Sequence, residues 1–255
     1  MTEEIQQKLS EIESTNNVKI LFACESGSRA WGFPSPDSDF DVRFVYIHAP
    51  DAYLSIDEKR DVIELPVNEI LDISGWDIRK ALKLFYKSNA PLYEWMQSPI
   101  LYRENFGFLK ELLSLAPEYF CHRAGMHHYL SMAANCFKND LQKGEVRLKK
   151  YFYALRPILA ARWIAERKEV PPMEFHTLLK LINDQKILLQ IDALLKRKLV
   201  SNESEMIVQI AELNDFIQSQ IEFCEEKAQE FLKKQNEIEP LNELFRQYVF
   251  KAWNS

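Results

Sequence analysis

Two aspartates separated by one residue, Asp39 and Asp41, follow the dipeptide Gly27-Ser28 after a spacer of ten residues. Side chains alternate along an extended chain, so both carboxylates project from one face while Phe40 turns toward the core. Carboxylates are hard oxygen ligands that suit Mg²⁺, which completes its octahedron with water and substrate phosphates. These residues therefore indicate a site for a divalent cation and a phosphate group.

The Gly27-Ser28 dipeptide adds a complementary feature. A glycine lets the backbone approach a ligand closely, and the N–H groups that open a short helix over Ser28–Trp31 can hold a phosphate. Each piece alone is also typical of a surface turn. The combination is narrower, because one apolar strand precedes the dipeptide and a second begins at the aspartates.

The elements that must position these residues fall in the first hundred positions. Short apolar runs are typical of buried strands, and apolar residues at helical spacing indicate helices. Asp77 suits the N-cap of one such helix. The expected order is a helix over 3–14, strands over 18–24 and 41–47, a hairpin of 62–65 with 69–73, and a helix that begins at 78.

After Ser98-Pro99 strand-like segments almost vanish and helical periodicity continues to the end of the chain. We therefore predict two domains with a boundary near residue 103. Residues 1–103 form an α/β (α+β) core with a mixed sheet, and residues 104–255 form an all-α domain.

The charge of the chain is divided in the same way. The net charge is −6, and such an acidic total argues against nucleic-acid binding. Residues 1–103 carry 11 basic and 17 acidic side chains, residues 104–200 carry 16 and 10, and residues 201–255 carry 5 and 11. The middle third is therefore basic, with a net charge of +6, and the total conceals it.

One segment of the basic part could meet a nucleotide. At helical spacing Lys149, Tyr153 and Arg156 share a face, with cations that can neutralise phosphates and a ring that can stack on a base. Lys150 replaces Lys149 as the contact if the helix is rotated. The alternative is an ordinary surface helix whose long cations cover apolar neighbours.

The segment GSRAWGFPSPDSDFDVRFVY resembles the signature of the DNA polymerase beta-like nucleotidyltransferase superfamily. It is more closely similar to the bacterial predicted nucleotidyltransferases of the YcgL type, some of which are linked to RNA repair. The stretches ISGWDIRKALKLFYKSNAPLYEWMQSPILY and KKYFYALRPILAARWI fit the same resemblance. The likeness covers most of residues 20–165.

The resemblance implies a compact mixed sheet with helices and a metal site for an NTP such as ATP. Asp39 and Asp41 would hold two Mg²⁺ ions, with Mn²⁺ as a possible substitute, around the triphosphate. The superfamily adds a third carboxylate from a neighbouring strand. Asp72 is favoured because Leu71-Asp72-Ile73 has the apolar-acid-apolar form of such a strand.

Other carboxylates compete for this third place. Asp77 is the rival, although helix capping explains it equally well, and Glu64 and Glu69 are weaker candidates. The nucleotide-binding residues expected with them are Gly27, Ser28, Arg29, Lys149 and Tyr153. Arg29 has an open alternative as a surface residue.

The implied activity is Mg²⁺-dependent transfer of a nucleoside monophosphate from an NTP to an acceptor, with release of pyrophosphate. An RNA end is the favoured acceptor, and a protein hydroxyl or a small alcohol stays open. Two readings from other classes compete with this one. The first is a non-catalytic nucleotide-sensing or antitoxin-like protein, and the second is an RNase centred on Arg123 and His128, whose spacing resembles that of HEPN ribonucleases.

The cysteines, the first residues and the lengths of the apolar runs indicate the cellular compartment of the protein. The four cysteines form no CxxC pair, which favours reduced thiols. The first residues are acidic and amphipathic, and no apolar run approaches the roughly 20 residues of a membrane span. We expect a cytoplasmic protein that does not enter a membrane.

Overall fold

The computed structural model describes residues 1–66, 70–234 and 236–254. Its contacts divide the chain into two compact units. The first unit comprises Met1–Gly27, Asp39–Tyr119 and Gln235–Ser255, and the second comprises Ser28–Ser38 and Phe120–Lys234.

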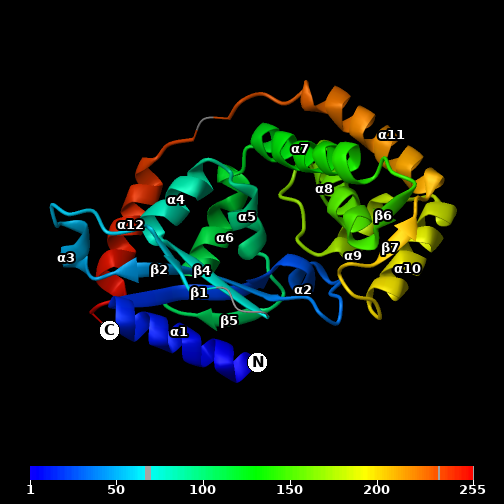
Figure 1. The fold of residues 1–255 in the computed structure, drawn as a ribbon. Coiled ribbons are helices and arrows are strands. Elements are labelled where there is room, and N and C mark those ends of the chain that lie inside the picture. The colour runs from blue at the N-terminus through cyan, green and yellow to red at the C-terminus, as the bar shows by residue number, and fades with distance from the viewer. Residues whose placement is uncertain (67–69, 235, 255) are drawn as a thin grey trace. The chain divides into compact units, whose positions relative to one another are not determined.

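The first unit is built on a five-stranded mixed sheet with the order β3-β4-β2-β1-β5 (Figure 1). The β2–β4 pair is parallel, and the other three pairs are antiparallel. The strands are β1 (Val18–Ser26), β2 (Phe40–His48), β3 (Val62–Glu64), β4 (Leu71–Asp77) and β5 (Leu101–Glu104). The predicted strands and the antiparallel pairing of the two hairpin arms are confirmed, while Val67, Asn68 and Glu69 lie outside the described residues.

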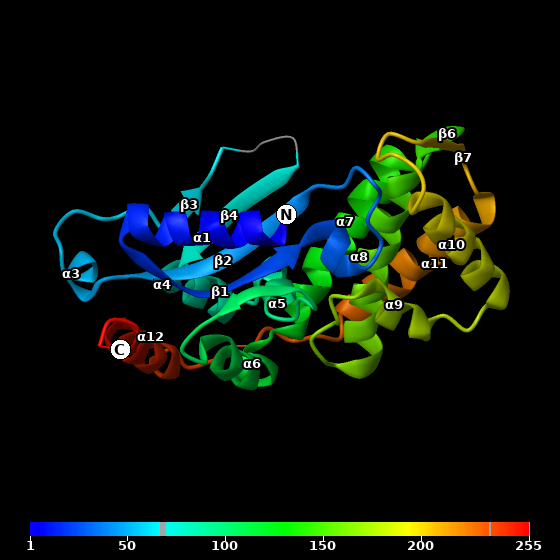
Figure 2. The ribbon, with the colours of Figure 1, turned by 90° about the horizontal axis from the view of Figure 1, so that it is seen from below.

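Helices cover both faces of this sheet. Helix α1 (Thr2–Asn16) lies along one face, as seen in Figure 2, and buries Ile5, Leu9 and Ile12 against the strands. The other helices of the unit are α3 (Pro50–Tyr53), α4 (Ile78–Tyr86), α5 (Ala90–Trp95), α6 (Phe108–Tyr119) and α12 (Glu239–Lys251). Helices α4, α5 and α6 pack on the strands from the face opposite α1, and α12 packs on α4.

The division by contacts differs from the boundary expected near residue 103. Strand β5 pairs with β1, and the Phe108 ring of α6 lies 6.4 Å from the Phe22 ring, so the chain is still part of the first unit beyond that point. The C-terminal helix returns to the same unit, where the Tyr248 hydroxyl donates to the carboxylate of Glu111 at 2.8 Å. Both segments join the first unit through contacts between residues far apart in the sequence, and local periodicity does not predict such contacts.

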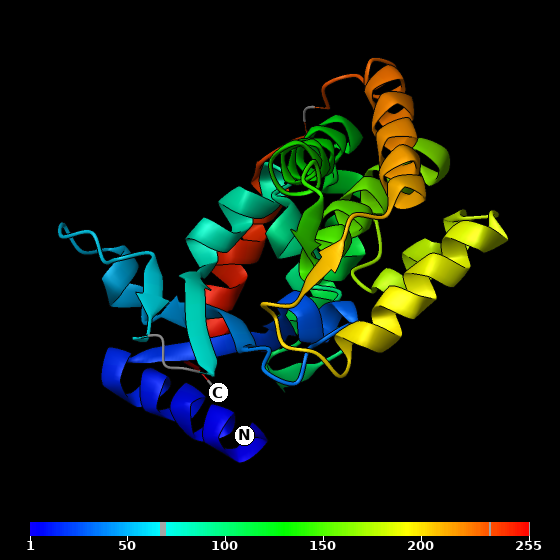
Figure 3. The ribbon, with the colours of Figure 1, turned by 45° about the vertical axis from the view of Figure 1, so that its right-hand side comes forward.

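The second unit is mainly helical. Its elements are α2 (Gly27–Trp31, from Ser28 onward), α7 (His122–Asp140), β6 (Glu145–Arg147), α8 (Leu148–Arg167), α9 (Phe175–Leu178), the 3-10 helix η1 (Leu179–Leu181), α10 (Gln185–Lys198), β7 (Met206–Val208) and α11 (Ala211–Ala228). Helices α7, α8 and α11 pack on one another (Figure 3). The antiparallel ribbon β6–β7 is an addition to the predicted all-α pattern.

The segment 28–38 belongs to this unit, where its residue Phe33 is buried. Phe33 is almost fully buried and stacks on Phe152 of α8, with ring centroids 4.9 Å apart. The ring of Phe175 meets both at right angles. In the part of the chain that the structure describes, no helix is both long and apolar enough to cross a membrane.

Candidate active site

The carboxylates of Asp41 and Asp72 lie together on neighbouring strands. The parallel register of β2 and β4 makes these two residues direct partners. Both carboxylates accept hydrogen bonds from one guanidinium nitrogen of Arg43, at 3.0 Å to Asp41 Oδ1 and 2.7 Å to Asp72 Oδ2. We call Asp41 and Asp72 the carboxylate pair, and Arg43 is its internal counter-ion.

Gly27 provides the surface against which Asp41 lies. A Cβ atom at this position would fall 2.1 Å from Asp41 Oδ2, and the φ angle of +63° lies in the left-handed region. Any other side chain would displace the carboxylate and also strain the backbone. The expectation from sequence was that Gly27 allows close approach of a ligand, whereas the structure shows that it allows close approach of Asp41.

Glu25 fixes the start of β2, and sequence reasoning missed it. Its carboxylate is fully buried, accepts the Asp41 backbone N–H at 2.8 Å and accepts the hydroxyl of Tyr102. A buried charge is tolerated when hydrogen bonds satisfy it. The available signal was an acidic residue directly after the mostly apolar run VKILFAC.

Asp39 stands one residue before β2, and its side chain is exposed. Among the described residues, no group of three or more His, Cys, Asp or Glu side chains is arranged to hold a metal ion. The structure brings together two of the three expected carboxylates, Asp41 and Asp72, and the metal-binding role of Asp39 stays a prediction.

Asp77 lies at the opposite end of β4 and on its other face. The alternating burial along this strand places Asp72 and Asp77 on different sides. Asp77 caps α4, because its carboxylate accepts the Arg79 N–H at 2.8 Å and the Tyr53 hydroxyl at 2.6 Å. Burial raises the pKa of this carboxyl, although both hydrogen bonds oppose the shift.

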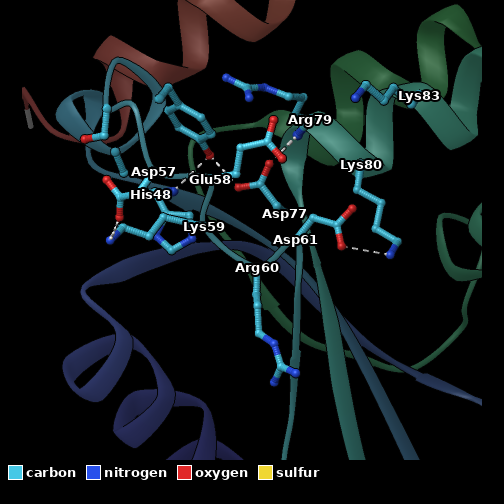
Figure 4. Close-up of a pocket in the computed structure, with 13 residues that line it drawn as sticks. His48, Asp57, Glu58, Lys59, Arg60, Asp61, Asp77, Arg79, Lys80 and Lys83 are labelled. Carbon is cyan, nitrogen blue, oxygen red and sulfur yellow. Dashed lines mark hydrogen bonds and ion pairs between the residues drawn. The ribbon is translucent and has the colours of Figure 1, made fainter.

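A separate cavity of about 480 Å³ surrounds Asp77, as Figure 4 shows. Two of its lysines are already paired, Lys59 with Asp57 at 2.8 Å and Lys80 with Asp61 at 3.1 Å. Glu64 lies on β3 and pairs with Ser74 of β4, so the whole of β4 separates it from Asp41 on β2. Geometry thus places Asp72, and neither Asp77 nor Glu64, beside Asp41.

The model of the RNA repair pathway DNA polymerase beta family (RlaP) matches residues 1–247 of the chain. The chain belongs to this family. It is also 44% identical over 255 residues to the uncharacterized protein YcgL of Bacillus subtilis (strain 168), covering 99% of this chain and 98% of that protein. Among solved structures, the chain is similar to a nucleotidyltransferase-like protein of Exiguobacterium sibiricum 255-15. The two share 14% identity with a TM-score of 0.33, and the likeness covers 89% of this chain and 75% of the other.

Membership in the RNA repair pathway DNA polymerase beta family confirms the resemblance read from the sequence. It makes the chain a DNA polymerase beta-like nucleotidyltransferase by family. The mixed sheet with flanking helices agrees with the α/β core expected for it.

In this protein, hydrogen bonds between residues near the two ends of the segment from Gly27 to Asp39 hold that segment in place. The Arg29 guanidinium donates to the carbonyl oxygen of Ser38 at 2.6 Å, and the Ser38 hydroxyl accepts the N–H of Ser35 at 2.9 Å. These contacts give Arg29 a positioning role that neither expectation from sequence included.

A partly buried ionic cluster of the second unit holds the same segment. Glu203 accepts hydrogen bonds from Ser38 at 2.7 Å and from Lys149 at 2.8 Å. Lys198, only 2% exposed, donates to the Ser35 hydroxyl at 2.7 Å and lies 3.5 Å from Glu203. We call Glu203, Lys149 and Lys198 the anchoring cluster.

The environment shifts the titration of this cluster. Burial lowers the pKa of Lys198, although the adjacent Glu203 opposes the shift. Burial works to raise the pKa of Glu203, but hydrogen bonds from Lys149 and Ser38 lower it overall. Sequence reasoning proposed Lys149 for the nucleotide and missed Glu203 and Lys198, since nothing local links them to a segment so far away in the chain.

The remaining predicted residues lie on α7 and α8. Tyr153 packs edge-on against Trp31, with ring centroids 6.1 Å apart, and Lys150 Nζ lies 5.8 Å from the Tyr153 ring. Arg123 and His128 both lie on α7, where a separation of five positions turns side chains about 140° apart around a helix. The helix therefore does not bring this proposed RNase pair onto one face.

Proposed function

We propose that the protein transfers a nucleoside monophosphate from an NTP to an acceptor hydroxyl or phosphate and releases pyrophosphate. The observation that carries the proposal is the carboxylate pair, whose members face each other across parallel strands and of which Asp41 lies against Gly27. Family membership supports the same class of reaction. An RNA end is the acceptor that we favour, because the family is described by RNA repair and the middle third of the sequence is basic.

The residues of the pair suit Mg²⁺ or Mn²⁺. Asp41 and Asp72 offer hard oxygen donors that are partly exposed, and their charge is already compensated by a cation, Arg43. In the proposal these two residues would hold the metal, with Asp39 as a further ligand at the entry to β2. When bound, such ions lower the pKa of an attacking hydroxyl and neutralise charge on the leaving pyrophosphate.

The residues of the chain have separate tasks in this proposal. Gly27 and Glu25 fix Asp41, one through its missing side chain and the other by accepting the Asp41 N–H. The backbone at Gly27 and Ser28 is assigned to the triphosphate. Arg29 and Lys149 act by holding the segment before Asp39, through Ser38 and Glu203 respectively.

The test is transfer from each labelled NTP to a pool of RNA in the presence of Mg²⁺. Asp41→Asn and Asp72→Asn each remove one charged donor at nearly constant volume, so we expect each to reduce transfer at least about a hundredfold, as for a group worth several kcal/mol in the transition state. Asp57→Asn is the matched control, because this aspartate is exposed and pairs with Lys59 on the surface. Transfer that survives in the double variant would refute the proposal.

A further inference from the structure

An open cavity of about 580 Å³ lies within the second unit, between α2, α7 and α8. Its volume falls in the range of small-molecule sites. The side chains that decide its chemistry are Trp31, Asn135, Asn139, Lys150, Tyr153 and Arg156. We call it the aromatic pocket.

The wall of the aromatic pocket is preformed. The Arg156 guanidinium lies 4.6 Å from the centre of the Trp31 ring. Arg156 is itself buried and donates twice to the carbonyl oxygen of Met173, at 3.1 and 3.0 Å. Trp31 in turn meets Tyr153 at right angles. Both rings are therefore held in place without a ligand.

The polar side of the pocket offers amides. Asn135 and Asn139 stand four positions apart on α7 and so share a face. Within the described residues neither side chain makes a hydrogen bond to the protein, and both are exposed. Each amide carries a donor and an acceptor, which can match the mixed edge of a heterocycle.

The charges of the pocket argue against a phosphate as its occupant. Lys150 is paired with Asp140 at 3.0 Å, and two of the guanidinium nitrogens of Arg156 donate to the carbonyl oxygen of Met173. A purely apolar ligand would offer no hydrogen-bond partner to the two amides or to the ion pair of Lys150 with Asp140. A planar ring with hydrogen-bonding groups on its edge satisfies both the aromatic wall and the amides.

We propose that the aromatic pocket binds a nucleobase, stacked on its aromatic wall and read by Asn135 and Asn139. The inference deepens the proposed function, because both an NTP and an RNA end carry such a base. Helix α2 links the two features along the chain, since it begins at Gly27, which seats Asp41, and ends at Trp31.

The test is equilibrium binding of the four nucleosides, the four NTPs and a short single-stranded RNA, without divalent cations. Asn135→Ala with Asn139→Ala, and separately Tyr153→Ala, should weaken binding of the preferred base at least about tenfold, in line with the loss of base stacking or edge contacts. Asn183→Ala is the matched control, an exposed asparagine of the same unit outside the pocket. Tighter binding of the NTP than of the RNA would identify the nucleotide as the source of the base, and the reverse order would identify the RNA.

The outcomes separate this inference from the proposed function. Base binding that depends on the pocket residues supports the inference even if no transfer is detected. Binding of every probe that is unchanged in all pocket variants overturns it, even if transfer proceeds. Asp41→Asn should abolish transfer and leave nucleoside binding unchanged. The asparagine variants are exposed helix positions where alanine favours the fold, so loss of binding there reports on the pocket.

Discussion

Arg43 is the counter-ion shared by both members of the carboxylate pair. It lies two positions after Asp41 on the same strand and reaches both carboxylates. Hydrogen bonds between charged groups typically contribute about 1.5–3 kcal/mol each. A cation bound by Asp41 and Asp72 would compete with Arg43 for the same oxygens.

Arg43→Gln should therefore change the response of the protein to divalent cations. Without them we expect the free energy of unfolding to fall by about 1–3 kcal/mol, because two carboxylates lose their counter-ion. Added Mg²⁺ should then raise the melting temperature more in the variant than in the wild type. Thermal melts with and without Mg²⁺ measure both effects, and equal responses in the two proteins would contradict the competition.

Gly27→Ala tests the seat of Asp41. The added methyl group would overlap the Asp41 carboxylate, and the left-handed backbone would cost about 1–2 kcal/mol for a residue with a side chain. We expect the rate of transfer to fall at least about tenfold, which is the effect of losing about 1.4 kcal/mol of contact energy in the transition state. Gly144→Ala is the control, since its new methyl group would meet no atom within 4 Å. Equal activity of the two variants would refute the assignment.

At the scale of elements, the site depends on one strand pairing. The N-terminal helix, predicted over 3–14 and observed over 2–16, both central strands and the Asp77 cap could be predicted, because periodicity and capping are local signals. The pairing of Asp41 with Asp72 depends on the register between β2 and β4, two strands that are separated along the chain by other elements. The sequence could favour Asp72 only by its apolar neighbours. Glu203 could not be found at all, since it meets Ser38 from 165 positions away.

The anchoring cluster predicts that a distant residue controls the segment before Asp39. Glu203→Gln leaves Lys198 buried without its charged partner, which should cost about 1–3 kcal/mol after allowance for the partial exposure of Glu203. Amide hydrogen exchange over residues 35–38 should accelerate, and transfer should fall with it. Glu230→Gln is the control, because it removes an exposed pair with Lys227 on the surface. Unchanged exchange in Glu203→Gln would contradict the anchoring role.

The cap of α4 makes a prediction about pH. Burial raises the folded-state pKa of Asp77 above its ordinary value of 3.8, so the folded state binds this proton more tightly than the unfolded state does. Stability from this group is therefore complete below pH 3.8 and is lost as pH rises through the raised pKa. Asp77→Asn keeps a capping side chain and removes the titration.

The comparison is urea unfolding of wild type and Asp77→Asn across acidic to neutral pH. The stability of the wild type relative to the variant should decline as pH rises. Asp61→Asn, at an exposed aspartate lining the same cavity, should leave the pH dependence unchanged. A relative stability that is constant or rises with pH would show that the charged form of Asp77 is the favoured one.

At the scale of the whole molecule, the net charge of −6 is the sum of two unlike units. The first unit carries 13 basic and 22 acidic side chains, and the second carries 19 and 16. The contact-based division thus concentrates the positive charge in the unit that contains the aromatic pocket. An RNA acceptor should be attracted mainly by this second unit.

This attraction predicts a salt dependence that maps to named residues. Lys143 and Arg147 are exposed, and no ion pair of the described residues involves either side chain. If both contact phosphates of single-stranded RNA, Lys143→Glu with Arg147→Glu should weaken binding and reduce the slope of log K against log salt by about 1.4. Lys110→Glu, an exposed lysine of the first unit, should change the slope much less. Fluorescence anisotropy of a labelled RNA over a salt series measures the slopes, and a larger effect for Lys110→Glu would place the RNA on the acidic unit.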